Sequence, residues 1–372
     1  MKKTIYPYKF VPVLKERVWG GNKLVNEYGK QTDIKGPIGE SWELSGFEDD
    51  SSVVAQGYME GNPIYDIIET YMDEIVGEDN YKRFGNEFPL LVKLLDIQER
   101  LSLQVHPDDE TAFDRHNSWG KSEAWYILDA DPGAKVYMGF KRDVTPAEFM
   151  ERAANGTLEE ILNEYPVRKG DFFYIEAGIV HSAGGGLQVA EIQQLSDVTY
   201  RIYDWGRENN PATRRQMHLE LAIDSINYSK YDEAQYRIPA TEHHHGPLTS
   251  NEHFTIQVYD LKDMLHIYTD RYESFILYVC LDGKAKLDFG KDGEYVLSKG
   301  EVILVPAASA DFYLSGMTPD AKVMESYIEK PQDHDEYIEE EDDCHCHDQE
   351  GHCHDHCHDH DHDCSDHKCN LS

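Results

Sequence analysis

The feature that most limits what this chain can fold into is a sequence frame that occurs twice. Residues 170–181 and 300–311 each begin with a glycine, continue with a five-residue, mainly apolar run, pass a second turn and end on a polar residue. The first copy ends on His181 and the second on Asp311, each eleven positions after its glycine. Short strands between turns are typical of an all-β module. Because 372 residues are too many for one compact core, we expect two such modules.

Short apolar runs elsewhere in the chain have the length of strands. The run at 89–96 is apolar almost throughout, which favours a buried strand. Turn signals at Asp282-Gly283 and Asp292-Gly293 predict two hairpins. Further strands are expected at 171–176, 187–203, 275–279, 286–289 and 301–305.

A few helices are expected as well. Residues 61–84 place apolar side chains at roughly helical spacing. Thr145, Pro146 and Glu148 together mark a helix start, as N-cap, first helical residue and third-position acid. Residues 214–226 are read as helical. The polar stretch 227–250, with three consecutive histidines from His243, is read as a linker loop.

Four residues in the first half have the chemistry of one metal site. Gln104 and His106 are two positions apart, so on a strand both side chains leave the same face. Glu123 and His181 complete the set. A lone histidine is usually structural, and an amide alone is a weak ligand, so the weight rests on the four together. Two imidazoles, a carboxylate and an amide oxygen suit a borderline divalent ion such as zinc.

The motifs that carry these residues also carry a family resemblance. They are the string Leu-Ser-Leu-Gln-Val-His-Pro-Asp at 101–108, Lys-Ser-Glu at 121–123, Gly-Ile-Val-His-Ser at 178–182, Glu191, and Ser-Asp-Val-Thr-Tyr-Arg at 196–201. In order and spacing, from about Phe10 to about Tyr327, they resemble type I mannose-6-phosphate isomerase in its short bacterial form. The chain departs from longer members by lacking a large helical insert, and Ser122 stands where many relatives have proline.

The frame at 170–181 resembles the second sequence motif of the cupin superfamily, whose fold is a small jelly-roll barrel. The implied fold is mainly β, with two cupin-type jelly-roll barrels, a few helices in the N-terminal half and a disordered C-terminal tail. We expect a catalytic domain with helical insertions at 1–240, a second domain at 241–332 and the tail at 333–372. The second barrel is expected to be metal-free, since Asp311 replaces the histidine.

The resemblance implies a zinc-dependent aldose–ketose isomerase that interconverts mannose 6-phosphate and fructose 6-phosphate through a cis-enediol. It implies zinc on Gln104, His106, Glu123 and His181, and a catalytic role for Arg201. Lys121 would bind phosphate, donate a proton or be a solvated loop lysine. Asp197 and Glu191 are candidates for the proton-transfer base, and Glu40 and Glu43 are weaker ones.

Two other classes stay open. One is a different metal-dependent cupin enzyme, such as an oxygenase or another sugar-phosphate isomerase. The other is a protein that stores metal or binds sugar without chemistry. The glutamine ligand argues against an oxygenase, which more often presents two histidines and a carboxylate.

Charge and cysteine content restrict the partners and the compartment. A net charge of −36 argues against nucleic acid and anionic membranes, and no apolar run approaches the ~18 residues of a membrane span. The N-terminus lacks a secretion signal, and only Cys280 lies outside the tail, so a reducing cytoplasm is expected. The expected partner is a small sugar phosphate, which needs a local cluster of Lys or Arg. The protein is expected to be a monomer or homodimer.

The tail is a second metal signal. Residues 344–369 contain six cysteines and nine histidines, and 333–372 carry 15 acidic residues and one lysine. The spacing fits no zinc-finger pattern. We expect a disordered acidic segment that takes up transition-metal ions in variable geometries.

Overall fold

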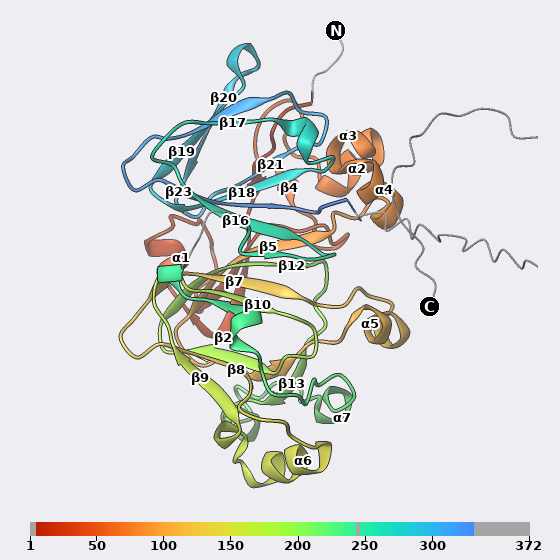
Figure 1. Cartoon of the computed structure of the whole chain (residues 1–372), viewed down its shortest axis with the longest axis vertical. Helices are drawn as coiled ribbons and strands as arrows, with labels where there is room; N and C mark the ends of the chain where they lie inside the picture. Colours follow the sequence, from red (N-terminus) through yellow and green to blue (C-terminus); the bar gives the residue numbers. More distant parts are fainter. Residues whose placement is uncertain (1–4, 243–245, 331–372) are drawn as a thin grey trace, which may run out of the picture. The chain divides into compact units, whose positions relative to one another are not determined.

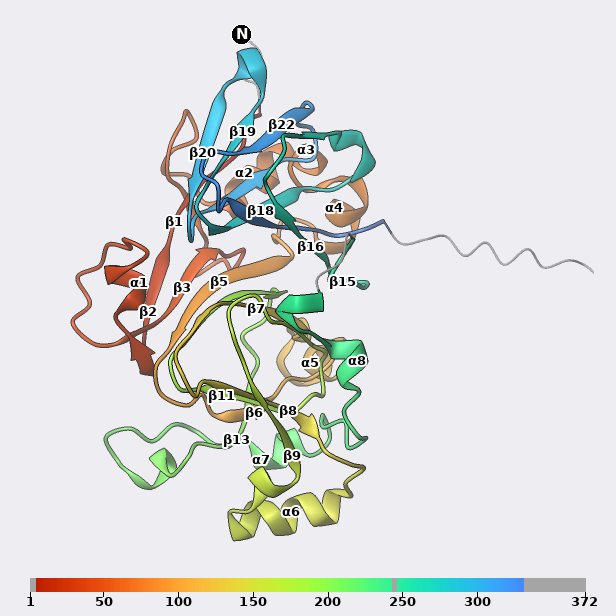
Figure 2. The ribbon, with the colours of Figure 1, turned by 60° about the vertical axis from the view of Figure 1, so that its left-hand side comes forward.

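A computed structural model describes residues 5–242 and 246–330 of the chain. The three histidines that begin at His243 and the predicted disordered, metal-binding tail lie outside the described residues. The described part consists mainly of antiparallel strands in four large sheets, which pack as two facing pairs (Figures 1 and 2).

The first pair of sheets contains the strands of the N-terminal two thirds of the described chain. Its seven-stranded sheet has the order β14-β10-β7-β12-β5-β3-β2, and its five-stranded sheet has the order β13-β6-β11-β8-β9. These strands are β2 (Val13–Gly21), β3 (Ile38–Leu44), β5 (Leu90–Ile97), β6 (Leu103–Val105), β7 (Glu123–Ala130), β8 (Lys135–Phe140), β9 (Leu162–Pro166), β10 (Phe172–Ile175), β11 (His181–Gly184), β12 (Leu187–Gln194), β13 (Tyr200–Tyr203) and β14 (Arg237–Ile238).

The second pair is made only of later residues. Its five-stranded sheet has the order β15-β16-β23-β18-β21, and its four-stranded sheet has the order β17-β22-β19-β20. These strands are β15 (Thr249–Ser250), β16 (Thr255–Asp260), β17 (Leu265–Ile267), β18 (Ile276–Asp282), β19 (Lys284–Asp288), β20 (Glu294–Ser298), β21 (Val302–Val305), β22 (Phe312–Gly316) and β23 (Lys322–Tyr327). A small separate sheet pairs β1 (Phe10–Val11) with β4 (Val53–Val54).

The helices are short and connect the strands. They are α1 (Lys23–Asn26), α2 (Ile64–Tyr71), α3 (Asp73–Val76), α4 (Glu78–Phe84), α5 (Asp109–His116), α6 (Pro146–Asn155), α7 (Leu219–Ala222) and α8 (Glu233–Tyr236), with single 3-10 turns at Leu158–Glu160, Arg207–Asn209, Ala240–Glu242, Thr269–Arg271 and Gly290–Asp292. Within the described ranges, the model contains no helix with the length and apolar character needed to cross a membrane.

The predicted helices are found with adjusted ends. The helical stretch at 61–84 is confirmed, but it breaks into α2, α3 and α4 where Met72 and Gly77 take positive φ angles of 51° and 93°. The predicted start at Thr145 is confirmed, since its side chain accepts a hydrogen bond from the Glu148 amide at the N-terminus of α6. The stretch 214–226 is helical only at α7, and 227–250 contains α8, β14 and β15.

Apolar cores fill the spaces between the layers. One core lies inside the first pair and joins residues such as Ile127 and Met138, and another lies inside the second pair. A third core lies between the seven-stranded sheet and the second five-stranded sheet, where Phe88 and Phe275 meet with ring centroids 4.7 Å apart. The third core therefore joins the first pair of sheets, which carries the candidate site, to the second pair.

The repeated frame has the same structural role in both pairs. In each copy the first strand lies in one sheet and the second lies in the facing sheet, as β10 and β11 in the first copy and β21 and β22 in the second. Each begins with a glycine in the left-handed region, Gly170 at φ +92° and Gly300 at φ +79°. A Cβ on Gly300 would lie 2.4 Å from a ring carbon of Tyr28, so only glycine fits there.

The mainly β, jelly-roll-like fold is confirmed, with one refinement and one correction. The sheets of each pair face each other without closing into complete barrels. The hairpin at Asp292-Gly293 is confirmed, since β19 pairs with β20. The hairpin at Asp282-Gly283 is wrong, because β18 and β19 belong to different sheets and the turn carries the chain from one sheet to the other. The boundary between 240 and 241 stays a prediction.

Candidate metal centre

A cavity of about 760 Å³ opens inside the first pair of sheets. Side chains from β2, β3, β5, β6, β7, β12 and β13 line it, so both sheets contribute to its wall. All the candidate site residues except Glu43 gather at or beside this cavity. Its volume lies in the range that small-molecule sites commonly have.

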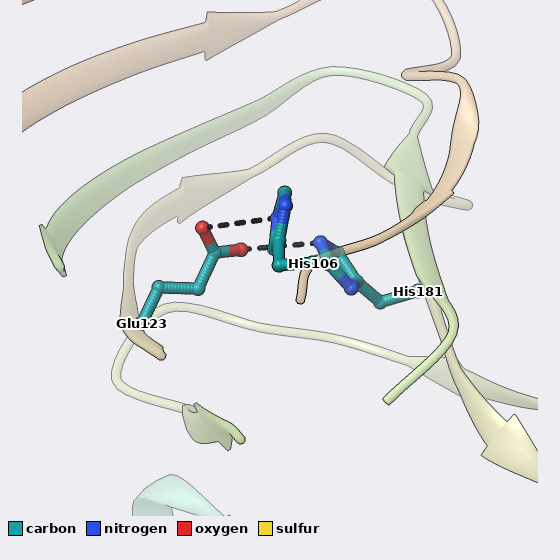
Figure 3. A group of neighbouring side chains, drawn as sticks. All are labelled: His106, Glu123 and His181. Atoms are coloured by element: carbon teal, nitrogen blue, oxygen red, sulfur yellow. Dashed lines mark ion pairs between the residues drawn. The ribbon is translucent and has the colours of Figure 1, made fainter. Parts of the chain in front are cut away.

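Three of the predicted ligands converge in one place (Figure 3). His106 follows β6, Glu123 begins β7 and His181 begins β11, so strand ends position all three. Their candidate ligand atoms all lie within 4.8 Å of one another, with His181 Nε2 3.1 Å from Glu123 Oε1 and His106 Nε2 3.5 Å from Glu123 Oε2. All three side chains are buried.

Gln104 joins the same group. It lies opposite His181 in the pairing of β6 with β11, and its Nε2 lies 3.1 Å from His181 Nε2. The oxygen and nitrogen of an amide are exchanged by a simple flip, which would turn the Gln104 oxygen toward this position. The structure therefore brings all four side chains together, and their roles as ligands stay a prediction.

Backbone carbonyls orient both imidazoles, and burial keeps the His106 ring in the neutral state that binds metal. His106 Nδ1 lies 3.0 Å from the Val198 carbonyl and His181 Nδ1 lies 2.9 Å from the Ile179 carbonyl. Each Nδ1–H donates to a carbonyl, so each Nε2 lone pair faces Glu123. Burial, with a contribution from Lys121, lowers the pKa of His106 to about 3, which keeps its ring neutral.

Glu123 and Lys121 show that the site accommodates positive charge. Burial alone would raise the pKa of Glu123, but the neighbouring Lys121 ammonium holds it well below its usual value. Neither Glu123 oxygen has a partner with hydrogen-bond geometry among the described residues. The Lys121 Nζ lies 2.7 Å from Glu123 Oε2 and 3.2 Å from His106 Nε2. An ammonium therefore stands beside two of the candidate ligand atoms, and the donor set fits a divalent cation. Lys121 is buried, so it is not a solvated loop lysine.

Six lysines and arginines line the cavity, although the chain as a whole is strongly acidic. Five of them have a carboxylate partner: Lys15 with Asp50 at 2.8 Å, Arg17 with Glu40 at 2.8 Å, Lys93 with Glu191 at 2.9 Å, Lys121 with Glu123 at 2.7 Å and Arg215 with Asp204 at 2.5 Å. The cluster of cations that a phosphorylated substrate requires is thus present in this cavity.

Arg201 differs from the other five. No carboxylate pairs with it among the described residues, and its buried Nε has no hydrogen-bond partner there. Its Nη1 donates to the Gln216 carbonyl at 2.7 Å. Burial and the neighbouring Arg215 lower its pKa to about 10, so it stays charged at neutral pH. Arg201 is the cation whose charge is most available to a bound anion.

The candidate bases occupy different surroundings. Glu191 is buried and accepts hydrogen bonds from Lys93 Nζ at 2.9 Å and from Trp125 Nε1 at 2.7 Å. Asp197 is an exposed residue on the cavity wall, next to the carbonyl that orients His106. Of the weaker candidates, Glu40 lines the cavity. Glu43 does not, and it pairs instead with Lys30 at 2.7 Å.

Sequence reasoning missed part of the cavity wall. Lys93 could have been found, because it is the lysine in the middle of an otherwise mainly apolar strand, β5, whose residues are all buried. A buried lysine needs a partner of opposite charge, which indicates a polar site. His218 is a lone histidine in the sequence and has no motif around it, yet it lines the cavity and its Nδ1 accepts a hydrogen bond from the Arg201 amide at 3.2 Å. The lysines, arginines and histidines of the wall that were not singled out as site residues are Lys15, Arg17, Lys93, Arg215, His116 and His218.

The fold and these residues define a cupin-type protein with a buried set of side chains of metal-ligating types beside a cationic cavity. Comparison with known proteins agrees. Residues 8–136 match the family model of the type I phosphomannose isomerase catalytic domain, and residues 247–327 match that of the mannose-6-phosphate isomerase cupin domain.

Similar proteins cover almost the same length. The mannose-6-phosphate isomerase of Streptococcus mutans is 32% identical over 309 residues, which are 81% of this chain and 92% of that protein. The mannose-6-phosphate isomerase ManA of Bacillus subtilis is 32% identical over 323 residues, 84% of this chain and 97% of that protein. The crystal structure of the Bacillus subtilis mannose 6-phosphate isomerase superposes with a TM-score of 0.74 at 27% identity, covering 87% of this chain and 100% of that one. The chain belongs to the type I mannose-6-phosphate isomerase family.

Proposed function

We propose that this protein is a zinc-dependent aldose–ketose isomerase that interconverts mannose 6-phosphate and fructose 6-phosphate through a cis-enediol or its anion. The observation that carries the proposal is the placement of Arg201 in the same cavity as Gln104, beside the buried His106–Glu123–His181 set. Family membership supports the choice of substrate, since the relatives named above are mannose-6-phosphate isomerases.

Charge in the cavity supports binding of a sugar phosphate. A phosphate dianion that enters the cavity meets Arg201, which forms no ion pair with any carboxylate in the described part of the chain, and the paired cations Arg17 and Arg215 nearby. Guanidinium groups match phosphate geometry because they donate two parallel hydrogen bonds. The acidic surface of the rest of the chain does not oppose this, since local charge in a cleft dominates the field that a bound ligand experiences.

The reaction needs one proton to leave C2 of the aldose and one to reach C1, while a hydroxyl proton is redistributed between the two oxygens. We assign the carbon-bound proton transfer to Asp197, because Glu191 is already committed to two donors that stabilise its charge. Arg201 complements the negative charge that develops on the oxygens, and Lys121 is positioned to supply or hold an oxygen-bound proton beside Glu123.

Gln104, His106, Glu123 and His181 would hold the zinc ion, which when bound supplies electrophilic stabilisation of the two substrate oxygens without changing its redox state. The buried Glu123 carboxylate, which has no partner with hydrogen-bond geometry among the described residues, and the neutral His106 ring fit this ion. The predicted cytoplasmic location and the monomeric or homodimeric state stay predictions.

A coupled assay tests the proposal. Mannose 6-phosphate should be converted to fructose 6-phosphate by the purified full chain, activity should disappear with a strong chelator, and zinc should restore it. His181→Ala should be inactive, whereas His253→Ala, a histidine away from the cavity wall, should retain activity. Asp197→Asn should lower kcat by about 10²–10⁴-fold. Chelator-resistant activity, or no formation of fructose 6-phosphate, would refute the proposal.

A further inference from the structure

A second cavity, of about 350 Å³, opens inside the second pair of sheets, and we call it the C-terminal cavity. None of the residues that line it contributes to the metal centre. They are Gln257, Tyr259, Leu265, His266, Ile267, Tyr268, Arg271, Tyr272 and Tyr327. Four of the nine are tyrosines, a composition quite different from that of the first cavity.

Strand pairing places this cavity where the first cavity lies in its own pair of sheets. In the first pair, His181 at the end of the frame lies opposite Gln104. In the second pair, Phe312 lies opposite Ile267, so the preceding residue, which ends the second frame, corresponds in register to Tyr268. Tyr268 therefore takes the position of Gln104, and it likewise lines a cavity.

A polar cluster in and behind the lining of the C-terminal cavity repeats, in register, a cluster that lines the first cavity. Glu325 on β23 lies opposite Gln257 on β16 and Tyr278 on β18. Its carboxyl group accepts from Gln257 Nε2 and from the Tyr278 hydroxyl, each at 2.5 Å. In the first pair, Glu191 likewise lies opposite Lys93 on one neighbouring strand and Trp125 on the other. Its carboxylate accepts a hydrogen bond from each of these two side chains.

Two further hydroxyl groups hold Glu325. Tyr272 donates to it at 3.1 Å and Tyr259 at 3.4 Å. A phenol oxygen that donates its proton can still accept a hydrogen bond, so both hydroxyls present acceptor sites to a ligand. Both tyrosines line the cavity.

The rim supplies flat faces and hydrogen-bond donors. The ring centroids of Tyr268 and His266 lie 4.1 Å apart. The guanidinium carbon of Arg271 lies 4.7 Å from the centroid of the Tyr268 ring. The rings of Tyr272 and Tyr327 meet edge to face at 4.7 Å. His266, Tyr268 and Arg271 are exposed and accessible from solvent.

We propose that the C-terminal cavity is a second binding site, for a monosaccharide or its phosphate ester. A sugar ring has C–H faces that pack on aromatic rings and hydroxyl groups that donate to Tyr259 and Tyr272 and accept from Gln257 and Arg271. The volume fits one ring rather than an oligosaccharide. The site binds without chemistry, because Tyr268 and Asp311 replace Gln104 and His181, and Asp311 is committed to the Thr269 amide at 3.0 Å.

Other occupants fit less well. An organic cation would gain from the aromatic rings but would be repelled by the positive charge of Arg271 at the rim, whereas a neutral or anionic sugar would not. A purely apolar ligand would cover the Gln257 amide and the tyrosine hydroxyls without pairing them, which is costly. A polyhydroxy compound satisfies both the donors and the acceptors.

Methyl-labelled full-length protein tests the proposal by NMR titration with mannose, mannose 6-phosphate and tetramethylammonium chloride. The Leu265 and Ile267 methyl groups report on the C-terminal cavity, and those of Leu95 and Leu101 report on the first. Leu265 and Ile267 should shift saturably with mannose or its phosphate. Tyr268→Ala and Tyr272→Ala should each raise the dissociation constant read from these signals tenfold or more.

Controls and contrary outcomes are separate from those of the isomerase proposal. The Leu95 and Leu101 shifts should be unchanged in both variants, and Tyr58→Ala, an exposed tyrosine elsewhere, should bind as the parent does. All five tryptophans lie within residues 19–205, so their emission verifies that the first pair of sheets is intact in each variant. Shifts confined to Leu95 and Leu101, tighter binding of tetramethylammonium, or full affinity in both variants would overturn the second site. Preferential binding of the phosphate would assign Arg271 to the phosphoryl group.

Discussion

At the scale of single residues, the sequence is most informative where side chains of one site are close in the chain. Gln104 and His106 are two residues apart, so strand geometry alone placed them together. Lys15, Arg17 and Arg215 could not be found in this way, because only the folded sheets bring β2 and the segment after β13 to one wall. Their carboxylate partners lie 35, 23 and 11 positions away in the chain, and no local pattern marks these pairs.

Arg201→Ala should lower kcat by about 10²–10³-fold, the usual cost of removing a charged group that faces a developing negative charge. Arg201→Lys should recover only part of the loss, since an ammonium lacks the two-pronged geometry of a guanidinium. Steady-state kinetics with mannose 6-phosphate measures both. Arg142→Ala, an exposed arginine on another surface, is the matched control, and equal effects at the two positions would contradict the assignment.

Glu325 should make stability depend on pH. Burial raises its pKa above 4.5 and outweighs the hydrogen bonds that lower it. As the pH rises through about 4.5, the unfolded chain releases this proton while the folded protein retains it, so the free energy of unfolding falls until the folded pKa is passed. Glu325→Gln should remove this decline. Urea unfolding from pH 4 to 7 measures it, with Glu69→Gln as an exposed control; parallel curves for parent and Glu325→Gln would contradict the prediction.

At the scale of elements, local chemistry decided which segments could be predicted. The start of α6 was readable because the cap is a contact between neighbours, from the Glu148 amide to Thr145. The turn at Asp282-Gly283 was misread because dipeptide chemistry specifies a reversal of the chain but not which sheet receives the next strand. That choice depends on packing between distant strands such as β18 and β23.

Thr145→Ala should reduce the free energy of unfolding by about 1 kcal/mol, because the first turn of α6 loses its side-chain acceptor. Chemical denaturation measures the change. Thr157→Ala is the matched control, since Thr157 precedes a 3-10 turn without making a side-chain cap. A loss of the same size at both threonines would show that the cap contributes nothing specific.

At the scale of the whole molecule, the repeated frame revealed two similar modules, but it could not show how they pack. The core that contains Phe88 and Phe275 draws residues from both sides of the predicted boundary at 240 and 241. Contacts between modules leave no periodic signal in the sequence. An apolar strand pattern indicates that the strand is buried, but not which other strand it packs against. The fold class was therefore predictable, whereas the continuity of the core was not.

Phe275→Ala should lower the free energy of unfolding by about 3–5 kcal/mol, since this buried ring packs against Phe88 across the two pairs of sheets. All five tryptophans lie within residues 19–205, so their emission reports on the first pair of sheets, whereas far-UV circular dichroism reports on the whole chain. Both signals should nevertheless follow one shared unfolding transition. Phe113→Ala, whose ring is 65% exposed, should change little. Two separate transitions would instead support independent domains.

The Cys/His-rich tail lies outside the described residues, and its role stays a hypothesis. If it supplies metal to the active site, deletion of residues 341–372 should raise the zinc concentration that gives half-maximal activity, with kcat at saturating zinc unchanged. Titration of metal-depleted enzyme with buffered zinc measures this. Identical zinc dependence of the full and shortened chains would remove the tail from the supply of metal.

The ammonium of Lys121 beside Glu123 has a thermodynamic consequence. Without an added ion, the negative carboxylate and the positive lysine balance each other, so the buried pocket is close to neutral. A divalent ion at the same position would leave an excess of positive charge, and a dianionic substrate would offset that excess. Ion and substrate should then each increase the affinity for the other by the same factor, because linkage between two bound ligands is reciprocal.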